Sequence, residues 1–135
     1  MSGGTSILVV DDEADTCRNL SDILTDLGYQ VDTALDGFAA LELARKKVYD
    51  IALLDLKMPG MDGLTLYREL RKIAASTVAI VVTAYASKAT SEEALAEGAD
   101  AVCYKPFDVP RLLSVLERLA AGHQRPEGGA DAGGR

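Results

Sequence analysis

Basic residues are in the minority in this chain of 135 residues, which has 14 lysines and arginines against 21 aspartates and glutamates and a formal net charge of -7. A protein that binds nucleic acid neutralises phosphates with clustered lysine and arginine, and no such cluster occurs in the sequence. The composition therefore argues against a nucleic-acid surface and against an output by direct DNA binding.

Long apolar runs are missing as well. The longest stretches, such as Val78–Val82, fall far short of the ~20 residues that cross a bilayer. Residues 1–15 have no charged segment followed by an apolar block, which a secretory signal would have. We expect a soluble, cytoplasmic chain that makes no contact with a membrane.

Cysteine and histidine are rare, with two copies and one copy respectively. Cys17 lies in a helical pattern and Cys103 in a strand pattern. Neither has the C-x-x-C spacing or the histidine neighbours of a metal or redox site. Cysteine is among the residues most often buried, so we expect two free thiols in the core.

Apolar residues make up 48% of the composition, which allows one core but, at this length, not two ordinary domains. Five times along the chain, an apolar or β-branched run is followed by apolar residues at helical spacing. The expected strands are 6–10, 30–34, 51–54, 78–82 and 101–104, and the expected helices are 14–27, 38–47, 64–75, 87–97 and 109–121.

The first, third and fourth of these strands are apolar throughout instead of alternating. This pattern is typical of a parallel sheet with helices on both faces, so the predicted fold class is α/β with a doubly wound five-stranded parallel sheet. We expect one domain over residues 5–121. Residues 122–135 are rich in glycine and polar side chains and cannot offset the entropy of ordering, so we expect a disordered polar tail, as for residues 1–4.

Polar side chains follow the ends of four of the expected strands. Ligands of an open α/β sheet bind beyond the carboxyl ends of its strands. Each of these residues alone has an ordinary explanation as a helix cap, a turn residue or a surface charge. Together they place every polar group that a phosphoryl-transfer site needs at one edge. In chain order they are Asp11, Asp12, Glu13, Asp55, Thr83 and Lys105.

Carboxylates that lie close together repel one another unless they share a proton or a cation. Because the expected ligands are all oxygens, a hard ion is favoured, Mg²⁺ or Mn²⁺ over Zn²⁺. Asp55 would then be the nucleophile that forms an acyl phosphate, while Thr83 and Lys105 meet the charge of the phosphoryl oxygens. The loop KMPGMDG can direct the carbonyl of Lys57 at the metal.

From about Ser6 to Leu119 the chain resembles the response-regulator receiver family, through the segments ILVVDDE, LLDLKMPGMDG, VVTAY and YKPF. The resemblance implies a flavodoxin-like (βα)5 fold with strand order 2-1-3-4-5, as in a single-domain receiver of the chemotaxis type. It implies a two-component or phosphorelay system in which a histidine kinase or a histidine phosphotransfer protein donates the phosphoryl group. It also implies a downstream protein target that binds the face of the fourth helix, fifth strand and fifth helix.

By the same resemblance, Asp55 is the phosphoacceptor. Asp12 and Asp55 bind Mg²⁺ directly with the carbonyl of Lys57, and Asp11 acts largely through a metal-bound water. Such a domain is not an enzyme in the ordinary sense, because it catalyses only its own phosphorylation and dephosphorylation.

Thr83 and Lys105 contact the phosphoryl oxygens in the family, and the bond between Lys105 and Pro106 is expected to be cis. One position departs from the family pattern. The aromatic or histidine switch residue that often lies three positions before the lysine is Val102 here. Tyr104 has the same strand parity and lies nearer the site, but we expect it only to pack.

Two alternative functions remain open. A small Mg²⁺-dependent phosphohydrolase also uses acids, a cation and lysine, although five short loops leave little room for a substrate pocket. A receiver-like interaction module could keep the fold without being phosphorylated. Nucleotide and flavin binding are disfavoured, because there is no G-x-x-x-x-G-K-[ST] loop and the segment DDEADT is not a Ser/Thr/Gly-rich phosphate loop.

Overall fold

The computed structural model describes residues 5–58, 60–83, 88–96, 98–105 and 109–123. Five parallel strands form one sheet in the order β2-β1-β3-β4-β5, which confirms the predicted fold class and strand order. The strands are β1 (Ser6–Val10), β2 (Gln30–Ala34), β3 (Ile51–Asp55), β4 (Val78–Thr83) and β5 (Ala101–Tyr104). The helices are α1 (Ala14–Asp26), α2 (Gly37–Lys46), α3 (Gly63–Ile73), α4 (Lys88–Ala96) and α5 (Val109–His123).

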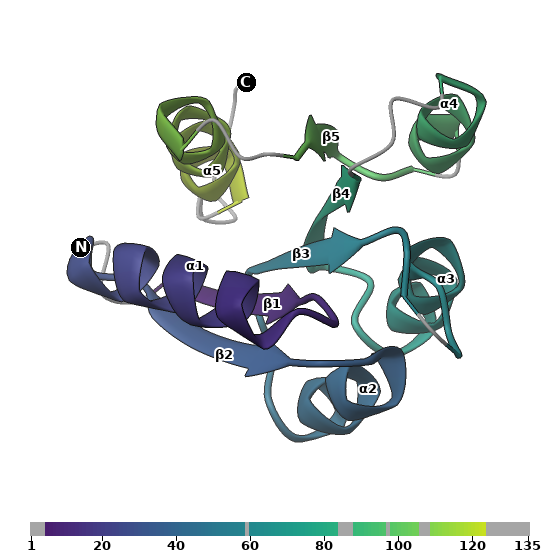
Figure 1. Ribbon diagram of the computed structural model, residues 1–135, viewed down its shortest axis with the longest axis horizontal. Coiled ribbons are helices and arrows are strands. Elements are labelled where there is room, and N and C mark those ends of the chain that lie inside the picture. Colours follow the sequence, from purple (N-terminus) through teal and green to yellow (C-terminus); the bar gives the residue numbers. More distant parts are fainter. Residues whose placement is uncertain (1–4, 59, 84–87, 97, 106–108, 124–135) are drawn as a thin grey trace.

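Helices cover both faces of the sheet, with α1 and α5 on one face and α2, α3 and α4 on the other (Figure 1). Because side chains of a strand alternate between the two faces, each inner strand contributes to two cores. In β1, Ile7 and Val9 pack with α1 and α5, whereas Leu8 and Val10 pack with α2 and α3. Full burial of each such side chain contributes about 1.5–3 kcal/mol, which explains why these strands are apolar throughout.

Two strands extend one residue further than the apolar pattern indicates. Asp55 still pairs with Val82 in the ladder, and Thr83 pairs with Tyr104. At the other end of the domain, α5 continues to His123. The tail expected to be disordered, residues 122–135, therefore begins too early, because residues 122–123 belong to the helix. Residues 1–4 and 124–135 lie outside the described residues.

Helices α2 and α3 begin in the same way. Each has an aspartate N-cap whose side chain accepts a hydrogen bond from the backbone N–H three residues later, and each has glycine as its first residue. The aspartates are Asp36 and Asp62, and the glycines are Gly37 and Gly63. This shared start makes the two helices a matched pair for mutagenesis.

Both cysteines, Cys17 and Cys103, are buried and free, as expected. Tyr104 was expected only to pack, but its side chain is half exposed at the end of the edge strand β5. Among the described residues, every helix is too short or too polar to cross a membrane.

Candidate functional site

Three carboxylates converge beyond the carboxyl ends of β1 and β3. One oxygen from each of Asp11, Asp12 and Asp55 lies within 4.8 Å of the others. Asp11 and Asp55 are buried, at 3% and 4% exposure, whereas Asp12 is exposed. The structure therefore brings together the three acids that the sequence placed at the ends of two different strands.

The alternation that builds the core also directs these side chains. Val9 in β1 and Leu53 in β3 face α1 and α5, so the next residues of the same parity, Asp11 and Asp55, point to that side. Lys105 continues the alternation of β5 toward the same side. Because β1 and β3 are neighbours in the sheet, the two acids become neighbours at its edge.

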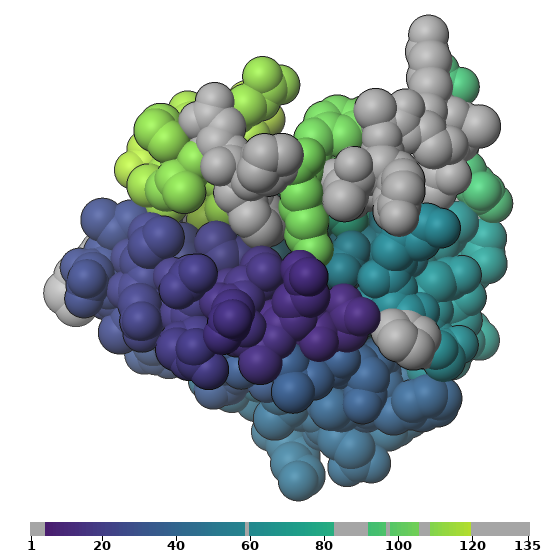
Figure 2. All heavy atoms as spheres, in the orientation of Figure 1, coloured from purple at the N-terminus to yellow at the C-terminus, as the bar shows by residue number. Residues whose placement is uncertain are grey.

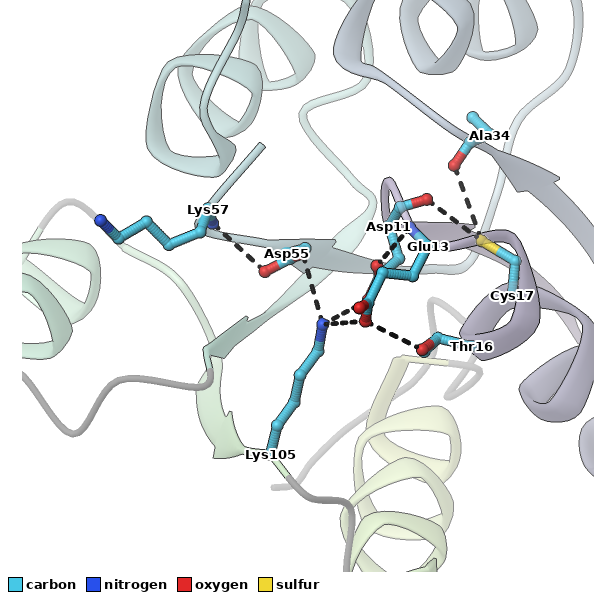
Figure 3. Close-up of polar contacts among 8 residues, drawn as sticks. All are labelled: Asp11, Glu13, Thr16, Cys17, Ala34, Asp55, Lys57 and Lys105. Atoms are coloured by element: carbon cyan, nitrogen blue, oxygen red, sulfur yellow. Dashed lines mark hydrogen bonds and ion pairs between the residues drawn. The ribbon is translucent and has the colours of Figure 1, made fainter. Parts of the chain in front are cut away.

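Lys105 supplies the positive charge of this cluster (Figure 3). Its Nζ lies 2.7 Å from Asp11 Oδ2, 3.3 Å from Asp55 Oδ2 and 3.8 Å from Glu13 Oε1. The side chain is 16% exposed, so these ion pairs are screened less than surface pairs are. Lys105 thus bridges the two buried acids, Asp11 and Asp55.

Backbone N–H groups fix the orientation of both buried acids. Asp11 Oδ1 accepts a hydrogen bond from the N–H of Glu13 at 2.9 Å, and Asp55 Oδ1 accepts one from the N–H of Lys57 at 3.2 Å. In each case the donor lies two residues after the aspartate, as in an Asx-turn. The second oxygen of each carboxylate is left to face Lys105.

Burial dominates the electrostatics of the phosphoacceptor candidate. It raises the pKa of Asp55, and the charge of Asp11 adds to this effect, while the Lys57 hydrogen bond and Lys105 act against it without cancelling it. For Lys105, burial alone would lower the pKa, but the hydrogen bond and charge of Asp11 and the pairing with Asp55 outweigh it, so the pKa is raised. The raised pKa of Lys105 shows that its acidic neighbours favour the charged ammonium group, and the raised pKa of Asp55 shows that Lys105 and the Lys57 N–H do not fully offset the burial of that carboxylate.

The first residue of α3 packs directly on the backbone of Asp55. A Cβ atom added to Gly63 would lie 2.2 Å from the carbonyl oxygen of Asp55 and 2.8 Å from Cα of Leu56. The N–H of Gly63 donates to the carbonyl of Leu56 at 3.1 Å. Gly63 therefore sets how closely the β3–α3 loop returns to the site, a role that the sequence showed only as a turn glycine.

Several expected features lie outside the described residues. Thr83 is the last residue of β4, but its side chain is not described. Pro106, on which the predicted cis bond depends, is not among the described residues. For Lys57, the structure shows the N–H contact with Asp55, and the role of its carbonyl stays a prediction.

Glu13 is the part of the site that sequence reasoning left without a role. It was noted only as the last acid after the first strand, yet its carboxylate contacts Lys105 from the start of α1. Pairing with a lysine 92 positions away depends on how β5 lies in the sheet, which local pattern does not show.

The donor set fits a hard divalent cation. Three carboxylates cluster here, two of them buried, and among the described residues Lys105 pairs with Asp11 and Asp55, so negative charge stays in excess. All the clustered ligand atoms are carboxylate oxygens, which Mg²⁺ and Mn²⁺ prefer.

A family model described as the response regulator receiver domain matches residues 7–117. The transcriptional regulatory protein ZraR of Salmonella typhimurium is 38% identical over 126 residues, which cover 93% of this chain but 28% of ZraR. A CheY-like receiver domain protein from Methanospirillum hungatei has a TM-score of 0.85 at 31% identity, with 89% of this chain and 96% of that chain covered. TrrA of Thermotoga maritima, solved in complex with Mg(2+)-BeF, has a TM-score of 0.76 at 36% identity, with 85% and 98% covered.

Proposed function

Because this chain belongs to the response regulator receiver domain family, we propose that it is a phosphoacceptor in a two-component or phosphorelay system. A phosphohistidine of a histidine kinase or of a histidine phosphotransfer protein donates the phosphoryl group. The P–N bond breaks as an oxygen of Asp55 bonds to phosphorus, which gives an acyl phosphate. The observation that carries this proposal is the convergence of Asp11, Asp12 and Asp55 with Lys105.

The residues around Asp55 have separate roles in this transfer. Asp11, Asp12, Asp55 and the carbonyl of Lys57 hold Mg²⁺, for which Mn²⁺ can substitute, and the bound ion supplies positive charge opposite the phosphoryl oxygens. The ammonium group of Lys105 already lies against Asp55, so it pairs with a phosphoryl oxygen after a short movement. The Thr83 hydroxyl completes the set as a hydrogen-bond donor.

The domain acts on itself and on partner proteins, not on a separate substrate. It catalyses its own phosphorylation and dephosphorylation, and the added charge of about two units biases the surface that a downstream protein binds. The proposed surface is the face of α4, β5 and α5. Leu95 and Tyr104, which are 48% and 49% exposed, provide apolar contact area there.

The test is phosphorylation with acetyl phosphate and with candidate histidine kinases, each in Mg²⁺ and in excess chelator. We expect a base-labile label that is lost in chelator and in Asp55→Asn, because the amide removes the nucleophile. Asp62→Asn is the matched control, because it changes an aspartate of the same β3–α3 loop to a residue that caps a helix equally well. It should be labelled like the wild type.

Each other outcome identifies an alternative. A full label on Asp55→Asn would show that another residue is the acceptor. A wild-type chain that takes up no label from any donor would be a receiver-like interaction module. Sustained release of phosphate from small phosphate esters, without labelled protein, would indicate a phosphohydrolase.

A further inference from the structure

Lys105 has a third carboxylate partner that lies outside the group of clustered acids. Among the described residues, its Nζ pairs with Asp11, Asp55 and Glu13, and only Glu13 is absent from the set of three acids that can share one cation. In the space-filling view, atoms of the green β5 segment reach the purple surface of the β1–α1 region (Figure 2). The contact thus joins the segments that follow the first and last strands of the sheet in chain order.

A hydrogen bond orients Glu13 toward the lysine. The hydroxyl of Thr16 donates to Glu13 Oε1 at 3.3 Å, and this is the same oxygen that faces Lys105 (Figure 3). Glu13 is the N-cap residue of α1, but its side chain makes no capping hydrogen bond. Its carboxylate is therefore used by Thr16 and Lys105 and not by the helix end.

The other acid at the start of α1, Asp15, does not behave in this way. Asp15 is 86% exposed and pairs with Arg18 on the outer surface of α1. The side chain of Glu13, at 67% exposure, is held on the site side of the turn. Negative charge in the first turn stabilises a helix in general, but that effect does not require contact with Lys105.

We propose that Glu13 is a positioning residue for Lys105, which retains the ammonium group at the site when the carboxylates of Asp11 and Asp55 are engaged by a divalent cation. This inference rests on the proposed function of the site. Without the cation, the ammonium group of Lys105 can pair with three carboxylates. When the cation is bound, Glu13 is the one of these three that does not bind the cation and can still pair with the lysine. Glu13 therefore stabilises the cation-bound form more than the free form, and only such a difference can shift the equilibrium.

The test is a double-mutant cycle read out as Mg²⁺ affinity. Amide NMR shifts are followed during Mg²⁺ titration of the full chain for the wild type, Glu13→Gln, Lys105→Gln and the double variant. A salt concentration of about 0.15 M screens charges more than ~8 Å apart. Because exposed ion pairs contribute modestly, we expect Glu13→Gln to weaken Mg²⁺ binding about two- to five-fold.

The decisive comparison is between backgrounds. Asp15→Asn is the control, because it removes a nearby charge that does not contact Lys105. In the Lys105→Gln background, Glu13→Gln should lower the Mg²⁺ affinity by no more than Asp15→Asn lowers it in the wild type. Equal weakening in both backgrounds would overturn the inference and indicate a long-range charge effect. An unchanged affinity in Glu13→Gln would overturn it too. A wild-type chain that binds no Mg²⁺ would instead refute the proposed function, and the inference with it.

Discussion

Gly63→Ala is predicted to damage both the stability and the phosphorylation of the domain. The added Cβ would lie 2.2 Å from the carbonyl oxygen of Asp55, whereas ordinary van der Waals contact begins near 3.4 Å. The two atoms must therefore separate by roughly 1 Å. Both belong to backbone-fixed positions, so no side-chain rotation can relieve the contact.

The magnitude follows from two opposing contributions. Overpacking of this kind costs about 1–3 kcal/mol. Alanine gains at most ~1 kcal/mol over glycine from helix propensity, and less at the first residue of a helix. We expect the free energy of unfolding to fall by about 1–2 kcal/mol. A displacement of Asp55 by roughly 1 Å should slow phosphorylation by up to ~100-fold, because reacting groups must be aligned closely.

Gly37→Ala is the matched control, because Gly37 occupies the corresponding first position of α2 after an aspartate N-cap. Its added Cβ would meet Met61, with Sδ at 2.7 Å and Cβ at 3.0 Å. The flexible thioether can move, and the contact with Cβ requires a shift of only a few tenths of an ångström. Urea denaturation and the initial rate of labelling by acetyl phosphate are measured for both variants. Gly37→Ala should stay within about 1 kcal/mol of the wild type and keep its labelling rate.

The reasoning is refuted if the two alanine variants are equally stable and equally reactive. That result would show that α3 moves away from β3 without cost. Loss of stability in Gly63→Ala with a normal labelling rate would confine the role of Gly63 to packing, and it would contradict the predicted displacement of Asp55.

Three further predictions concern other parts of the fold. The Tyr49 hydroxyl donates to Asp32 Oδ2 at 2.6 Å and lowers the pKa of Asp32. This pair therefore stabilises the fold fully above the unfolded pKa of about 3.9, and the effect is lost as the pH falls from there through the lower pKa of the folded state. Tyr49→Phe should lower the free energy of unfolding by about 1 kcal/mol at neutral pH, a value already reduced for the 41% exposure of the carboxylate. In urea denaturation, the difference between this variant and the wild type should shrink below pH ~4. Gly98→Ala should lower the free energy of unfolding by about 1–3 kcal/mol, because φ is +108° and the added Cβ lies 2.8 Å from the Tyr67 hydroxyl; an unchanged midpoint contradicts this. Cys17 should resist alkylation in the native state, since burial shields the thiol and raises its pKa, and rapid native modification in a mass-spectrometric assay would be contrary to this.

The order and type of elements could be predicted from sequence because each depends on a local pattern. Apolar runs such as Ile51–Leu54 are buried on both faces, and few other structures bury four successive side chains. The ends were less certain. The hydrophobic pattern stops at a polar residue, but the backbone ladder continues through Asp55, whose partner in β4 is Val82.

Some residues of the site could be predicted from the sequence, because local patterns show where each strand ends. Residues that follow parallel strands must meet at one edge, so Asp11, Asp55 and Lys105 could be grouped in advance. Which atoms make contact could not be read from the sequence. The approach of Gly63 to Asp55 and the pairing of Glu13 with Lys105 depend on loop paths and on how β5 lies in the sheet.

The site and the core use the same strand alternation, and this sets opposing demands on Asp55. Its backbone continues the ladder of β3, and its side chain has the parity of buried Leu53, so the residue is only 4% exposed. Burial raises its pKa, which means that a charged Asp55 destabilises the fold at neutral pH relative to an uncharged side chain. Lys105 offsets part of this penalty, but it also faces Asp11 at 2.7 Å and so serves two acids with one charge. A ligand that adds positive charge here must therefore stabilise the folded chain as it binds, and the proposed phosphoryl transfer would use a buried cluster whose two buried acids share one lysine.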